Sequence, residues 1–298
     1  MPWPFDREYM QLALVAGVVV GATAPLIGGF LVQRRMSLLG DGIGHLAFAG
    51  VAGGLLLEVW PVWTALIVAV LGAVAVERLR AGGRASGDLA LALFFYGGIA
   101  GGVVLTGLAG SLDAGLFAYL FGSILTVEPA DVWTVVGLGA GIVLVVTLTG
   151  RALFATVVDE ESARVAGIPV DALNMMLAAL TAVTVVAAMR VVGLLLVAAL
   201  MVLPVGASRQ VARSFRGSQA GAVAVGIASV VAGLVLARAG GLAPGGTIVL
   251  LAAAAFGITS LVVGLRRGRP VRDTLAWREG SPAPQVAADA TRPQEPSQ

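Results

Sequence analysis

Long apolar runs separated by short polar stretches dominate the chain. They cover about residues 10–33, 42–57, 62–77, 88–109, 132–150, 171–189, 191–206, 219–238 and 246–265. A helix needs about 20 apolar residues to cross a bilayer, and several runs approach or exceed that length. We therefore predict an all-α, polytopic integral membrane protein with eight or nine transmembrane helices. A shorter run, 115–126, is amphipathic, and we expect it at the membrane interface or as a re-entrant piece.

The arginines set the expected orientation, because loops rich in arginine stay on the cytoplasmic side. They follow every second apolar run: Arg34 and Arg35, Arg78 and Arg80, Arg151, Arg209 and Arg213, and Arg266. The opposite loops hold mainly acidic residues. We predict an N-terminus outside, a cytoplasmic C-terminus and nine crossings. Eight or ten crossings remain open, because the two runs within 171–206 are short and could partly re-enter.

Composition supports the membrane assignment and separates a tail. Hydrophobic residues make up 58% of the chain and charged residues 12%, about half the share found in soluble domains. The expected transmembrane domain spans residues 1–269. Beyond it, residues 270–298 are rich in Pro, Ala and Gln, so we predict a disordered cytoplasmic tail.

The absence of two residue types excludes several chemistries. Without Cys, the chain has no disulfides, thiolate metal sites or thiol catalysis. All 19 basic residues are Arg, and a P-loop needs a Lys on the nucleotide phosphates. Transport driven by ATP would therefore need an ATPase on another polypeptide. We expect this chain to catalyse no covalent reaction and to hold no tight cofactor.

One apolar run carries the candidate metal ligands Asp41 and His45, the latter being the single histidine of the chain. Four residues advance a helix by about 400°, so both side chains lie on one face and can reach one cation. Placing an acidic side chain within a membrane costs free energy, so such a residue tends to be paired or to line a water-filled path. The alternative is that Asp41 caps the helix and His45 is merely packed.

The number of ligands bears on what such a site could do. A closed structural zinc site needs four ligands, and this chain supplies one histidine. A two-fold dimer would bring two Asp/His pairs together, whereas one pair with water or carbonyl oxygens would hold an ion loosely. Either arrangement suits a conduit, because a transported ion must leave again.

A polar loop between two apolar runs predicts a short helix on the cytoplasmic face. Asp159 can cap its N-terminus, and Glu160 and Glu161 favour the helix dipole in its first turn. Gly167 ends it in the left-handed manner, with Pro169 two residues on. Such a helix serves either as a docking element or as an ordinary interfacial loop; Ala163 and Arg164 complete it.

Several segments together resemble the permease subunit of bacterial ABC importers for zinc, manganese or iron, from about Ala16 to Leu265. The segments that carry the resemblance are Arg34-Arg35-Met36 to Asp41 and His45, Ala118-Tyr119-Leu120-Phe121-Gly122, Ala163 to Gly167, Val192-Gly193 to Pro204 with Ala207-Ser208-Arg209, and Pro244-Gly245-Gly246.

The resemblance implies a multi-pass plasma-membrane protein that imports a divalent transition-metal ion, zinc or manganese, with iron as a third choice. It implies a paired transmembrane unit such as a homodimer, a separate ABC ATPase, and a metal-binding receptor protein outside. The metal-path role falls on Asp41 and His45, and the ATPase-coupling role on Asp159, Glu160, Glu161, Ala163, Arg164 and Gly167. Two positions depart from the zinc-type pattern: Tyr96 stands in place of a His, and Ser123 in place of an Asp.

Other functional classes remain open. One is a related ABC permease for a metal chelate, which would tolerate loss of His45. Another is a secondary transporter driven by an ion gradient, which would work without an ATPase. A membrane scaffold is the third, and an intramembrane Asp/His pair is unexpected in it.

Overall fold

Long helices joined by short turns make up the part of the chain that the computed structural model describes, residues 4–82, 87–109, 114–123 and 127–267. In chain order they are α1 (Glu8–Gln33), α2 (Leu39–Leu56), α3 (Pro61–Ala81), α4 (Gly87–Leu108), α5 (Ala114–Phe121), α6 (Pro129–Val158), α7 (Glu160–Val165), α8 (Val170–Ala188), α9 (Val197–Arg209), α10 (Phe215–Gly240) and α11 (Pro244–Arg267).

The prediction of an all-α membrane protein is confirmed. Among the described residues, eight helices are long and apolar enough to cross a membrane: α1, α2, α3, α4, α6, α8, α10 and α11. The orientation of the chain stays a prediction. The expected tail, 270–298, and residues 124–126 of the short run lie outside the described residues.

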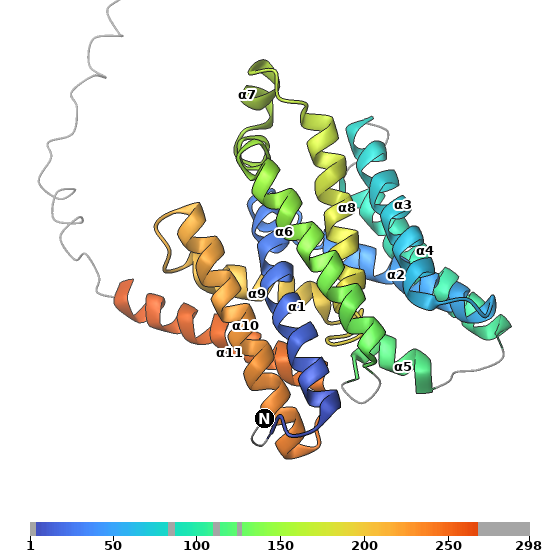
Figure 1. Cartoon of the computed structure of the whole chain (residues 1–298). Helices are drawn as coiled ribbons and strands as arrows, with labels where there is room; N and C mark the ends of the chain where they lie inside the picture. The colour runs from blue at the N-terminus through green and yellow to red at the C-terminus, as the bar shows by residue number, and fades with distance from the viewer. Residues whose placement is uncertain (1–3, 83–86, 110–113, 124–126, 268–298) are drawn as a thin grey trace, which may run out of the picture. The chain divides into compact units, whose positions relative to one another are not determined.

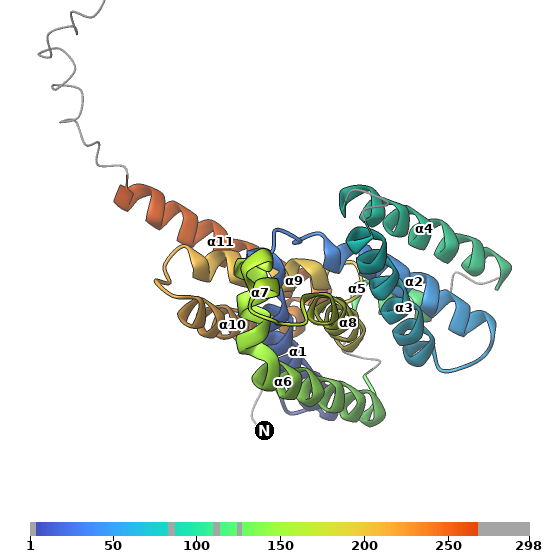
Figure 2. The ribbon, with the colours of Figure 1, turned by 90° about the horizontal axis from the view of Figure 1, so that it is seen from above.

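The residues up to Ser260 form one compact unit, and a second, short unit begins at Leu261 within α11. Within the first unit, α2 packs against α3 and α4, whereas α1 packs against α6, α9 and α10. Helix α8 contacts α1, α2, α3 and α6 and so joins the two groups (Figures 1 and 2).

Local sequence signals explain several helix ends. Pro61 and Pro129 stand in the first turns of α3 and α6, where no intrahelical donor is needed. Glu128 and Asp131 form a reciprocal capping box at the start of α6. Gly241 adopts a left-handed conformation after α10.

The apolar run 191–206 forms a helix only in its second half, since α9 begins at Val197. The prediction of a helical span over the whole run is therefore wrong. Residues 189–196 are non-helical, and the amide of Leu194 donates to the carbonyl of Tyr119 at 3.0 Å and that of Leu195 to Leu120 at 3.2 Å. Non-helical backbone persists at membrane depth only where protein covers it. Val191, Val192 and Leu194 meet that condition, each at most 1% exposed.

Two glycines make this buried segment feasible. Gly193 has φ +96°, a conformation that other residues rarely adopt, and its Cα faces the backbone that follows Leu120. At Gly245, an added Cβ would collide with the carbonyl oxygen of Val192. The backbone at Gly193 therefore packs directly against the end of α5, and the backbone at Gly245 packs against Val192.

A buried ion pair ties this segment to α6. The guanidinium of Arg190 lies 2.7 Å from the carboxylate of Asp131, whose side chain is 2% exposed. The same guanidinium lies over the ring of Tyr119 in α5, 4.8 Å from its centroid. Arg190 therefore connects the non-helical segment to two helices.

Candidate functional site

Asp41 and His45 lie one helical turn apart at the N-terminal end of α2. The helix begins at Leu39, and Leu38 occupies the capping position. Asp41 is therefore the third residue of the first turn, and the alternative in which it caps the helix is wrong. A carboxylate in the first turn is still favourable for the helix dipole, by roughly 0.3–1 kcal/mol when exposed.

The two side chains are close enough to share one ion. The Nε2 atom of His45 lies 3.9 Å from an Oδ atom of Asp41, which is longer than a hydrogen bond. Because ligand atoms lie about 2.0–2.2 Å from a zinc ion, two of them stand about 3.4 Å apart in a regular tetrahedral site and at most about 4.4 Å apart when they lie on opposite sides of the ion. The observed separation lies within that limit.

Helix α4 fixes the position of His45. The imidazole stands edge-on to the ring of Phe95, with centroids 4.3 Å apart. Gly98 lies against the backbone of His45, and an added Cβ there would meet it at 2.7 Å. This close approach leaves the imidazole side chain only 13% exposed, whereas that of Asp41 is 33% exposed.

Asp41 borders a cavity of about 230 Å³ between the start of α2 and α4, lined by Leu38, Asp41, Leu91, Ala92, Phe95 and Tyr96. Tyr96 thus lies beside the candidate ligands, in the fourth helix as expected. Ser123 lies elsewhere, after α5, where its amide donates to the carbonyl of Arg190 at 3.2 Å.

Among the described residues, the candidate ligand set is a pair. In the described part of the chain, no group of three or more His, Asp or Glu side chains could hold a metal ion. Asp41 and His45 therefore offer one carboxylate and one imidazole, a combination that suits zinc or manganese.

The short polar helix forms as predicted, as α7. The backbone amide of Ser162 donates to Asp159 at 3.0 Å, and Gly167 has φ +78° after the last turn. Hydrogen bonds from Ser162 hold the pKa of Asp159 below its ordinary value. The cap is therefore ionised at neutral pH, and its contribution disappears only as the pH falls through the acidic carboxyl range. Ala163 packs inward at 4% exposure, whereas Val165 points outward at 86%.

Glu77 is a buried charge that the sequence analysis missed. It lies in the last turns of α3 and is 2% exposed. Arg80 donates to it from one turn further on, at 3.0 Å, and Arg34 from the end of α1, at 3.3 Å. The Glu77/Arg80 spacing was visible in the sequence, but nothing there showed that Arg34 would meet it.

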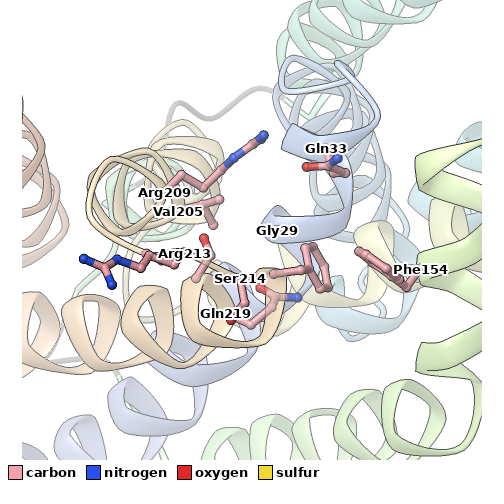
Figure 3. Close-up of a pocket in the computed structure, with 11 residues that line it drawn as sticks. Gly29, Gln33, Phe154, Val205, Arg209, Arg213, Ser214 and Gln219 are labelled. Atoms are coloured by element: carbon pink, nitrogen blue, oxygen red, sulfur yellow. The ribbon is translucent and has the colours of Figure 1, made fainter.

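A second cavity, of about 310 Å³, lies among α1, α6, α9 and α10 (Figure 3). Its wall includes Gly29, Gln33, Phe154, Arg209 and Gln219. Neither Asp41 nor His45 lines it. The candidate ion site and this cavity are therefore separate features.

Comparison with known proteins gives a family and several relatives. The model of the ABC 3 transport family matches residues 6–263. A manganese transport system membrane protein, MntC from Halalkalibacterium halodurans, is 31% identical, over 84% of this chain and 86% of its own. The high-affinity zinc uptake system membrane protein ZnuB from Haemophilus influenzae is 30% identical, over 84% and 95%.

Two solved structures have the same fold. PsaBC from Streptococcus pneumoniae, in complex with Fab, gives a TM-score of 0.77 at 31% identity, covering 85% of this chain and 91% of that one. A putative metal-chelate type ABC transporter in an inward-facing conformation gives 0.65 at 15% identity, covering 85% of each chain. The latter likeness supports the fold alone.

Proposed function

The chain belongs to the ABC 3 transport family, and on that premise we propose that it imports a divalent transition-metal ion, manganese or zinc. Members of this family are non-catalytic, multi-pass membrane components of bacterial ABC import systems. Relatives at about 30% identity include membrane proteins of a manganese and of a zinc system, which supports both ions as cargo.

The Asp41/His45 pair is the observation that carries this proposal. It is a carboxylate and an imidazole 3.9 Å apart, beside a cavity, in a helix that is otherwise apolar. One chain alone offers two protein ligands and would hold an ion weakly, which suits an ion that must be released. A chelate importer would have no need of direct ligands, and the 15%-identical chelate transporter adds no support for that alternative.

We propose that two copies of the chain complete the site. Each copy offers one carboxylate and one imidazole, so a two-fold dimer would present four protein ligands. Asp41 is the more exposed member of the pair and borders the cavity lined by α4, so the pair has an open side. The mass of the purified complex gives the copy number, and one copy per complex would contradict this part of the proposal.

The ATPase of the system would dock on the short capped helix α7. The residues expected to couple this helix to the ATPase are Asp159, Glu160, Glu161, Ala163, Arg164 and Gly167. The most exposed apolar side chain of α7 is Val165. An apolar side chain held out from a small polar helix is suited to fill a groove on a partner.

Val165→Asp is therefore expected to lower co-purification of the ATPase by at least about tenfold, since one desolvated charge in an interface costs more than 1.4 kcal/mol. Val165→Thr keeps the shape of the side chain and serves as the control. Equal recovery of the ATPase with both variants would place the docking surface elsewhere.

The test of the proposed function is ATP-dependent uptake of manganese or zinc by this chain assembled with its ATPase and its metal receptor. The chain alone is expected to be inactive. Uptake by the chain alone, driven by an ion gradient, would instead favour a secondary transporter.

A further inference from the structure

Six charged side chains form one continuous series of ion pairs between α3 and α8. In order they are Arg80, Glu77, Arg34, Glu160, Arg164 and Asp171, with positive and negative charges alternating. The N···O distances along the series are 3.0, 3.3, 3.5, 3.5 and 2.8 Å. We call it the charge series.

The Glu77–Arg34 pair of the charge series is buried, whereas the end at Asp171 is exposed. The side chains of Glu77 and Arg34 are 3% and 7% exposed, whereas those of Glu160 and Asp171 are 44% and 59% exposed. Exposed ion pairs rearrange at little cost, but a buried charge that loses its partner is strongly penalised. The Glu77–Arg34 step is therefore the one that must stay intact when neighbouring helices move.

Arg34 lies between α1 and the turn that leads into α2. It is the capping residue directly after α1, and Arg35 follows with φ +59°, a strained conformation for a residue other than glycine. The turn 35–38 then leads directly into α2, whose first turn contains Asp41. A displacement of Arg34 therefore acts on the turn that orients the candidate metal ligand.

The turn has space in which to move. A cavity of about 290 Å³ is lined by Arg34 and the turn 35–38 together with Leu39 of α2, Val76 and Arg80 of α3, and Leu91 of α4. Leu38 and Leu91 also line the cavity beside Asp41. The two cavities therefore adjoin at these two side chains.

We propose that Glu77 is a positioning residue for transport. It holds Arg34 so that a displacement of α7, received by Arg34 from Glu160, reaches the turn 35–38 and Asp41. This inference rests on the proposed function, in which the ATPase docks on α7, and adds that the ATPase displaces α7. Glu77 itself touches no metal in this scheme.

The test uses the complete complex of chain, ATPase and receptor with Glu77→Gln. Glutamine keeps the shape of the side chain and removes the charge that holds Arg34. We expect metal uptake per ATP hydrolysed to fall about tenfold, which lies within the range of effects that mutations between coupled sites have on coupling. The ATPase should still co-purify and hydrolyse ATP. Glu8→Gln, an equivalent change at an exposed residue of α1, is the control and should leave the ratio unchanged.

A second measurement separates transmission from general damage. Because the chain has no Cys, single fluorophores can be placed at Ala166→Cys, beside α7, or at Leu38→Cys, before α2; both residues are exposed. With native Glu77, ATP should change the emission of both labels. With Glu77→Gln, only the label at residue 166 should respond. If the Glu77→Gln chain fails to fold, Glu77→Asp keeps the buried charge but draws the carboxylate back from Arg34, and again only the label at residue 166 should respond to ATP.

The outcomes distinguish this inference from the proposed function. The inference would be overturned if the Glu77→Gln complex transported as much metal per ATP hydrolysed as the native complex, or if both labels in it responded equally to ATP. Either result would leave the proposed metal path intact. Absence of ATP-dependent metal uptake with the native chain would instead overturn the proposed function.

Discussion

Replacing Asp41 or His45 by alanine is expected to lower metal uptake by at least about tenfold. Loss of a residue that merely supports a metal ligand costs about 10–100-fold in affinity or activity, and loss of one of two protein ligands should cost no less. The measurement is accumulation of manganese, zinc and iron in cells that depend on this chain, with the amount of the chain in the membrane determined for each variant.

Tyr96→Phe is the matched control for those variants. Tyr96 lines the same cavity as Asp41, and the change removes only its hydroxyl group. Uptake close to the native level would show that perturbing the cavity wall is insufficient to stop transport. Native uptake of all three metals in both Asp41→Ala and His45→Ala would contradict the ion-path role of the pair.

The largest effect on stability is expected for Arg190→Ala. This change deprives Asp131, whose side chain is 2% exposed in the native chain, of the guanidinium that lies 2.7 Å away. Removing one partner of a buried ion pair costs about 3–5 kcal/mol, and the cation–π contact with Tyr119 is lost as well. Thermal unfolding of the purified chain in detergent measures the effect.

Arg238 provides a control with the same chemistry in a wetter setting. It lies 2.6 Å from Asp6 and over the ring of Tyr9, but the Asp6 side chain is 44% exposed. Loss of a solvent-exposed pair costs about 0–1 kcal/mol. The Arg190→Ala chain should therefore unfold at a clearly lower temperature than the Arg238→Ala chain. Equal unfolding temperatures would show that burial of Asp131 does not determine how much its ion pair with Arg190 stabilises the chain.

Hydrophobic runs predicted most of the fold because lipid-spanning helices have a strong length and composition signal. The exception, residues 189–196, is as apolar as a helix. Its non-helical path depends on carbonyl partners at Tyr119 and Leu120, 75 residues before Leu194 and Leu195 in the sequence. Periodicity within one segment carries no information about such partners. The turn residue Gly193 was visible, but Gly is common throughout this chain.

The candidate sites were predictable to different degrees. The i, i+4 spacing of Asp41 and His45 and the capping signals of α7 are local, and the structure has both features. The capping role assigned to Asp41 as an alternative failed because α2 begins two residues earlier, at Leu39. The burial and pairing of Glu77 were not predicted, because its partner Arg34 is 43 residues away in the sequence.

The most direct measurement is uptake of manganese and zinc into liposomes that contain this chain, its ATPase and its metal receptor, with and without ATP, for the native chain and for His45→Ala. We predict that the native complex accumulates at least one of the two metals only with ATP, and that the His45→Ala complex accumulates at most about a tenth as much. Uptake without ATP, or equal uptake by both complexes, would contradict an ATP-driven ion path through Asp41 and His45.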